Sequence, residues 1–169
     1  MVLMDLATGR PVRTFPGNAD RIQTAVFAPD GKTVLSASWD KTLKLWDLAT
    51  GRLLRTFAGH QDYITTAVIT PDGKTAVSGC TDGIIKTWDL ASGKALRTLR
   101  GHGASLDTLL VSRDGATLFS GSDDGTLRTW DLATGMELTA TMADRDGEWL
   151  TWTPKGHFTG SAKAAHDYV

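Results

Sequence analysis

Lys-Leu-Trp-Asp-Leu-Ala-Thr-Gly occupies residues 44–51, and nearly the same words return at 86–93 and again at 128–135. Successive copies are therefore 42 residues apart. A fourth copy starts at Met4, which stands where the other three have Trp, and continues as Asp-Leu-Ala-Thr-Gly through residue 9. A fixed period of this length indicates a repeat architecture in which each repeat is one small structural unit.

Other words follow the same period. Arg-Thr-Phe or Arg-Thr-Leu occurs at residues 13–15, 55–57 and 97–99. Gly-His occurs at 59–60 and 101–102, and Gly-Asn stands in its place at 17–18. Pro-Asp-Gly-Lys occurs at 29–32 and 71–74 and is weakened to Arg-Asp-Gly-Ala at 113–116. Chance does not align so many words at one offset.

Each unit is predicted to hold four short strands. In the first complete unit these are Ile22 to Ala28, Thr33 to Ser38, Thr42 to Leu48 and Leu53 to Phe57, which are apolar or β-branched and separated by turns. Pro29-Asp30-Gly31 is a typical turn, since Pro presets φ and Gly accepts a positive φ. One such sheet cannot cover its own apolar faces, so the units are expected to stack as the blades of a propeller.

The Gly-His start, the Pro-Asp-Gly turn and the closing Trp-Asp resemble the WD-repeat family of β-propellers, and the likeness covers roughly residues 3 to 142. The resemblance implies an all-β fold of four-stranded antiparallel blades. It also implies a hydrogen-bonded set of four side chains in each blade. These sets are His60, Ser78, Asp82 and Trp88; His102, Ser120, Asp124 and Trp130; and the weaker Asn18, Ser36, Asp40 and Trp46.

No catalytic residue, metal site or cofactor is predicted. His, Ser and Asp recur together in several blades, which favours a structural role over an active site, and no Gly-x-Ser-x-Gly elbow is present. Asp123-Asp124-Gly125 lacks the later ligands of a calcium loop, so turn chemistry explains it better. Cys80 has no partner at metal-ligand spacing and falls in a second strand, where a buried structural thiol is expected.

The resemblance also indicates a binding face, formed by the loops that enter the first strands and those that join the second strands to the third. The residues of this chain at those positions are Arg21, Tyr63, Ser105, Trp39, Thr81 and Asp123. Trp39 differs most from its counterparts, which are small or polar, and an exposed Trp is a frequent binding anchor. The other interpretation is that Trp39 packs sideways against the adjacent blade.

The predicted boundaries are a half-blade at 1–17, blades at about 18–59, 60–101 and 102–142, and a C-terminal half-blade at 143–169. Met1 to Leu6 and Pro11 to Phe15 would be a third and fourth strand, and Glu148 to Thr153 and His157 to Ser161 a first and second. Three arrangements fit these halves: a piece of a longer propeller, two chains that close one ring as a homodimer, or one chain closed as a four-bladed ring.

The segment from Trp149 to Ser161 resembles the last blade of large bacterial WD-repeat proteins, some of which carry a caspase-like peptidase domain. Lys155 and His157 depart from the usual Glu and Tyr of that blade. The Cys-His pair of such peptidases would lie outside this chain, so the likeness implies context and no activity.

Composition limits the remaining functions. The net charge of -1 gives no general attraction to nucleic acid or anionic lipid. One cysteine, no secretory signal and no long apolar run predict a cytoplasmic protein outside the membrane. The predicted function is a non-catalytic scaffold for protein–protein interaction. The alternative is the regulatory or recruiting propeller of a larger bacterial enzyme such as a caspase-like peptidase or a kinase.

Overall fold

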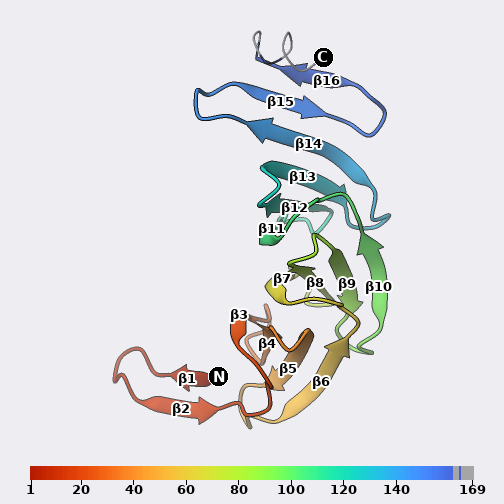
Figure 1. Ribbon diagram of the computed structural model, residues 1–169. Coiled ribbons are helices and arrows are strands. Elements are labelled where there is room, and N and C mark those ends of the chain that lie inside the picture. The colour runs from red at the N-terminus through yellow and green to blue at the C-terminus, as the bar shows by residue number, and fades with distance from the viewer. Residues whose placement is uncertain (162–163, 165–169) are drawn as a thin grey trace.

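The computed structural model describes residues 1–161 and residue 164. Its strands form antiparallel sheets that follow one another along an open arc (Figure 1). The first sheet holds β1 (Val2–Met4) and β2 (Pro11–Thr14). The second holds β3 (Ile22–Phe27), β4 (Thr33–Ser38), β5 (Thr42–Asp47) and β6 (Leu53–Ala58). The third holds β7 (Ile64–Ile69), β8 (Thr75–Cys80), β9 (Ile85–Asp89) and β10 (Ala95–Leu99).

The last sheet is longer than the others. It holds β11 (Leu106–Val111), β12 (Thr117–Ser122), β13 (Thr126–Asp131), β14 (Glu137–Ala143), β15 (Trp149–Trp152) and β16 (Phe158–Gly160). Within each sheet, strands adjacent in sequence are hydrogen-bonded neighbours. We call β3–β6 the first blade, β7–β10 the second blade and β11–β14 the third blade. The strands β3, β7 and β11 lie side by side along the inner side of the arc. The prediction of an all-β fold built from four-stranded antiparallel blades is confirmed.

The repeated words specify the turns. Gly31 in the Pro-Asp-Gly turn has a φ of 66°, which a side chain would strain, and the Asp30 carboxylate accepts the Lys32 N–H at 2.9 Å. In the Trp-Asp word, the Asp47 carboxylate accepts the Thr50 N–H at 2.7 Å and so fixes the turn into β6. The same two bonds recur in the second and third blades, where the acceptors are Asp72 and Asp114 in the first turn and Asp89 and Asp131 in the other.

Apolar clusters between consecutive sheets form the core. Three tryptophans recur with the 42-residue period, namely Trp46, Trp88 and Trp130. Each is 1% exposed and lies in one of these clusters, at the seam between two consecutive sheets. The Trp88 ring packs edge-on against Phe57 of the preceding blade, with ring centroids 6.0 Å apart. The Phe or Leu of the Arg-Thr-Phe word therefore packs against the Trp of the next blade, and this contact explains why both words share one period.

The arginine of the same word joins blades at their outer edge. Arg55 Nη1 donates to the Ser92 carbonyl at 2.9 Å, and a Cβ at Gly93 would lie 2.6 Å from Arg55 Cδ. Arg97 repeats the arrangement with the Ala133 carbonyl and with Gly135. The glycine that closes each Trp-Asp turn is therefore needed twice, for its positive φ and for the arginine that lies across it.

The tail differs from the expectation of a separate C-terminal half-blade at 143–169. β15 pairs antiparallel with β14, with Thr141 opposite Thr151, so the tail hairpin extends the third blade instead of starting a new one. The reason is the tight turn between them, where the Asp144 carboxylate accepts the backbone N–H of Glu148 at 3.0 Å and Gly147 has a φ of 83°. The predicted residues beyond Ser161, apart from Ala164, lie outside the described part of the chain.

The arc does not close on itself. β1 and β16 lie at opposite ends of it (Figure 1), so a single chain does not form the four-bladed ring that was considered. The outer face of the third blade is uncovered: Phe119 and Leu127 are 37% and 47% exposed, whereas their counterparts Leu35 and Leu43 are fully buried against the second blade. Closure by a second copy, or by further blades of a longer chain, stays a prediction.

Candidate functional site

The third blade brings its four predicted polar residues together. His102 Nδ1 donates to the Asp124 carboxylate at 2.8 Å, while His102 Nε2 lies 2.7 Å from the Ser120 hydroxyl. Trp130 Nε1 donates to the same hydroxyl at 2.8 Å. Asp124 also accepts from the Gly103 N–H and from Thr126. Burial opposes the ionisation of Asp124, but these hydrogen bonds outweigh it and hold the pKa of Asp124 well below its usual range.

The second blade brings only three of its four residues together. His60 Nε2 and Trp88 Nε1 both lie 2.8 Å from the Ser78 hydroxyl. Asp82 does not reach His60; its carboxylate accepts from the Cys80 thiol and from the Ile84 N–H. His60 Nδ1 is therefore buried without a hydrogen-bond partner among the described residues.

Two neighbouring residues explain why Asp82 points away. The third blade has Ser122 before its Asp and Thr126 after it, and both hydroxyls bind within the turn. The second blade has Cys80 and Ile84 at these positions. Burial raises the pKa of the Cys80 thiol to about 12, with the adjacent Asp82 adding to the effect. Cys80 is thus a buried, protonated thiol, as the sequence predicts.

The unpaired His60 ring is electrostatically unusual. Burial lowers its pKa to about 4, the positive charge of Lys86 adds to the shift, and Asp82 only partly opposes it. The ring therefore stays neutral through the physiological range. His60 Nε2 contacts the Ser78 hydroxyl, but His60 Nδ1 faces no carboxylate that would orient the ring and stabilise its charged form, so the third member of a Ser-His-Asp arrangement is not in place.

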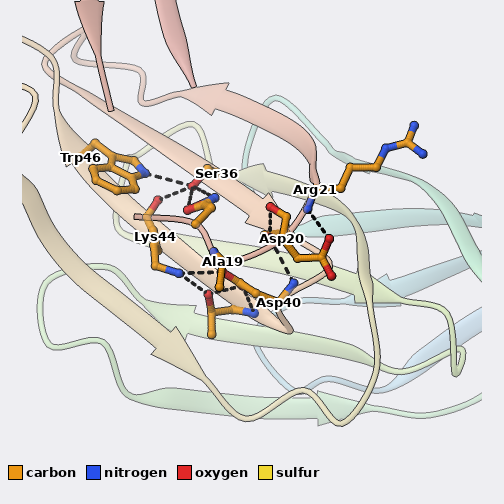
Figure 2. A network of polar contacts seen from close by, with 10 residues as sticks. Ala19, Asp20, Arg21, Ser36, Asp40, Lys44 and Trp46 are labelled. Atoms are coloured by element: carbon orange, nitrogen blue, oxygen red, sulfur yellow. Dashed lines mark hydrogen bonds and ion pairs between the residues drawn. The ribbon is translucent and has the colours of Figure 1, made fainter. Parts of the chain in front are cut away.

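In the first blade Asn18 occupies the position of the histidine, and Lys44 of β5 is the side chain that pairs with the aspartate. Asn18 Nδ2 donates to the Ser36 hydroxyl at 3.2 Å, and Trp46 Nε1 donates to it at 2.9 Å (Figure 2). Asp40 does not contact Asn18; Lys44 Nζ lies 2.8 Å from its carboxylate. Burial opposes the ionisation of Asp40, but the hydrogen bonds from Lys44, Thr42 and Ala19 lower its pKa to about 2.

The six predicted partner-binding residues lie at one end of the sheets, where β3, β7 and β11 begin and β4, β8 and β12 end. We call this the upper face. A backbone hydrogen bond joins the six into three pairs: Trp39 N donates to the Arg21 carbonyl, Thr81 N to that of Tyr63, and Asp123 N to that of Ser105. The structure therefore places all six on one surface, two from each blade.

Trp39 is not the freely exposed anchor that one interpretation of the sequence suggested. Its ring stacks on Tyr63 of the second blade at 5.2 Å with an interplanar angle of 14°, and the Arg21 guanidinium lies 4.8 Å above the ring. Both flat sides of the indole are thus covered, which agrees with the alternative that it packs sideways on the adjacent blade. The exposed members of this stack are Arg21 and Tyr63.

Sequence reasoning missed two residues of the upper face. Lys41 has a φ of 67°, and its Nζ donates to the Gln61 carbonyl at 2.9 Å. The signal was its place in the period, because Gly83 and Gly125 stand at the same position in the other blades. Asp107 lies beside Asp123; partial burial raises the pKa of Asp107, and the neighbouring carboxylate adds to the shift.

The opposite end of the sheets, the lower face, carries grooves between neighbouring blades. The larger one has a volume of about 510 Å³ and lies between the second and third blades, where Leu96 and Asp114 are among its lining residues. A groove of about 280 Å³ lies between the first and second blades. In the described residues, no group of three or more His, Cys, Asp or Glu side chains is placed to hold a metal ion. None of the described helical residues forms a segment long and apolar enough to cross a membrane.

Repeated four-stranded blades, packed seam to seam and capped by Trp-Asp turns, define a β-propeller segment. The family model "WD domain, G-beta repeat" matches residues 9–47, 51–89 and 93–131. The chain therefore belongs to the WD40 repeat family, whose propellers generally act as protein-interaction scaffolds and are typically non-catalytic.

Individual relatives match over shorter stretches. The chain is 50% identical over 42 residues to the small ribosomal subunit protein RACK1 of Saccharomyces cerevisiae, which is 25% of this chain and 13% of that protein. It is 50% identical over 38 residues to the protein of the same name from Caenorhabditis elegans, which is 22% of this chain and 12% of that protein.

Solved structures show the same fold over most of the chain. The RRP9 WD40 repeats superpose with a TM-score of 0.72 at 24% identity, over 88% of this chain and 53% of that one. The structure of U3-55K gives a TM-score of 0.73 at 24% identity, over 88% and 54%. The chain thus spans about half the length of these propellers. The likeness of its tail to bacterial proteins with a caspase-like domain stays a prediction.

Proposed function

We propose that this chain is a non-catalytic interaction scaffold that binds segments of other proteins on its upper face, over the first and second blades. The observation that carries the proposal is the Trp39–Tyr63 stack. It fixes two blades together, leaves Tyr63 42% exposed, and has the Arg21 guanidinium over the same Trp39 ring. Tyr and Arg held rigidly at the surface are the residue types that dominate binding energy in protein interfaces.

The polar networks support a structural role for the remaining candidate residues. The hydroxyls of Ser36, Ser78 and Ser120 are each buried and each accept an indole N–H. A serine in this position holds the strands of its own blade in register and is not accessible to a substrate. These networks therefore make the upper face rigid, which lowers the entropic cost of binding.

The test is selection of binders from a displayed library of random 12-residue peptides against the immobilised chain. We expect enriched peptides whose binding is lost in Tyr63→Ala. Leu96→Ala is the matched control, because Leu96 is comparably exposed at 50% but lines the lower groove, and it should leave binding unchanged. Loss of binding in Leu96→Ala with retention in Tyr63→Ala would move the site to the lower face, and a selection without enrichment would overturn the proposal.

A further inference from the structure

We propose that Arg21 and Lys41 on the upper face recognise the carboxylate side chains of an acidic segment in the partner protein. This inference rests on the proposed function and adds the chemistry of the partner to it. Arg21 would bind a carboxylate directly, and Lys41, in the turn between β4 and β5, would supply a second positive charge. The partner class follows from four observations on the upper face.

The first observation is the position of the Arg21 guanidinium. Its centre lies 4.8 Å from the Trp39 ring centroid, and within the described residues it forms no hydrogen bond or ion pair. The guanidinium carbon lies over the indole ring, and its N–H donors, which have no partner among the described residues, can bind a carboxylate in a bidentate fashion. Figure 2 shows the Arg21 side chain extending away from the polar network around Asp40.

The second observation is that the platform below Arg21 is fixed. Trp39 is held from behind by Tyr63 at 5.2 Å and by the backbone bond from its own N–H to the Arg21 carbonyl at 2.9 Å. The guanidinium is therefore ordered before a partner arrives. Neither Tyr63 nor Ser105, the counterparts of Arg21 in the other blades, carries a charge of this kind.

The third observation is the strained backbone of Lys41. A non-glycine residue with a φ of 67° is uncommon, and the other blades use glycine at this position. Strain of this kind concentrates at functional sites. Lys41 Nζ donates to the Gln61 carbonyl and lies 6.0 Å from the centre of the Tyr63 ring, so its charge is held over the same aromatic stack.

The fourth observation is how the nearby carboxylates are placed. Asp40 is paired with Lys44, and Asp20 accepts the backbone N–H of Arg21 rather than its guanidinium. Asp62 and Asp82 of the second blade accept backbone N–H groups of their own turns, whereas Asp107 and Asp123 of the third blade lie beside each other. The adjacent carboxylates of the third blade would repel an acidic segment most, which favours the first two blades. Two cations on a chain of net charge -1 do not form the broad basic surface that a long nucleic acid requires.

The experiment uses the peptides selected on the whole chain and measures their affinity by fluorescence anisotropy for paired variants. We expect peptides rich in Asp or Glu, with affinity lowered about tenfold in Arg21→Gln, which is the loss of one charge-assisted hydrogen-bonded pair. Arg21→Lys should recover only part of the affinity, because the fork geometry is lost. Arg113→Gln is the matched control: it removes one exposed positive charge on the lower face and should change nothing.

The outcomes separate this inference from the proposed function. Peptides that need Tyr63 but are not acidic, or that bind Arg21→Gln as well as the wild type, would overturn the carboxylate proposal alone. Stronger binding of a 12-nucleotide single-stranded DNA probe than of the acidic peptides, lost in Arg21→Gln, would assign the cations to nucleic acid and overturn it as well. A selection that yields no peptides would overturn both proposals.

Discussion

In the third blade the His102 ring is hydrogen-bonded to both Ser120 and Asp124, whereas in the second blade the His60 ring is hydrogen-bonded to Ser78 but not to Asp82. Both blades have the His, Ser, Asp and Trp of the repeat at the same spacing. The difference arises at the positions two residues before and two residues after the aspartate. Ser122 and Thr126 in the third blade hold Asp124 toward the histidine, and Cys80 and Ile84 in the second blade leave Asp82 turned outward.

A repeated set of side chains does not by itself fix a repeated hydrogen-bond network. A carboxylate near a surface turn binds whichever donors its turn presents, and the hydroxyl groups of Ser122 and Thr126 are part of that presentation. The consequence in the second blade is a buried imidazole nitrogen with no partner in the described structure, which is costly unless the ring stays neutral.

The largest expected effect is a pH dependence that originates at His60. The folded ring has its pKa lowered to about 4, while the unfolded ring takes a proton near 6.5. The unfolded chain therefore binds more protons between these two pH values. The free energy of unfolding should be highest above pH 6.5 and should fall by roughly 3 kcal/mol as the pH drops to 4. Urea unfolding from pH 7.5 to 4.5 measures this, and His60→Gln should flatten the slope. A His60 ring that titrates near 6.5 by NMR would contradict the explanation.

The next effect compares the two turn aspartates directly. Asp124→Ala removes an acceptor that serves His102, Thr126 and the Gly103 N–H, and should lower the free energy of unfolding by about 2–3 kcal/mol. Asp82→Ala removes an exposed acceptor that serves no buried histidine and should cost less than about 1 kcal/mol. Urea unfolding at pH 7 measures both. Equal losses would mean that Asp82 reaches His60 in solution.

Most of the fold followed from the sequence because the repeat words specify local geometry. The strand at Thr33–Ser38 has the predicted bounds, and Gly31 in the Pro-Asp-Gly turn has the predicted positive φ. The tail was predicted less well. Its sequence resembles the first and second strands of a blade. That resemblance does not specify which sheet the hairpin joins, and the tight turn at Asp144 pairs it with β14.

The candidate site was predicted in position more than in detail. The resemblance to WD repeats put Arg21, Trp39 and Tyr63 on one face. Their stacking depends on how adjacent blades are oriented relative to each other. The sequence pattern within one blade does not specify that orientation. The ion pair between Asp40 and Lys44, four residues later, was also missed. The repeat does not predict it, because Lys86 at the same position of the second blade donates to Thr98 instead.

Transferring the turn residues of the third blade to the second blade tests whether they orient the aspartate. The double change Cys80→Ser with Ile84→Thr supplies the two hydroxyls that orient Asp124, so Asp82 should turn to His60 Nδ1. The new partner should raise the pKa of His60 above its present value of about 4, and should stabilise the fold by about 1 kcal/mol. An NMR titration of the His60 ring measures the shift. Cys80→Ser alone is the control, and an unchanged pKa in the double variant would show that another contact holds Asp82 away.

The smallest expected effect tests what the two blades share. Arg55 and Arg97 form the same outer contact across successive seams, each with the closing turn of the next blade. Arg55→Gln and Arg97→Gln should each lower the free energy of unfolding by about 0.5–1 kcal/mol, since each removes one surface hydrogen bond to a backbone carbonyl. Near-equal values from urea unfolding would confine the difference between the seams to the upper end of the blades. If Arg55→Gln lowers the free energy of unfolding more than twice as much as Arg97→Gln, the outer contact stabilises the seam beside His60 more than the next seam. The two blades would then differ along their whole length.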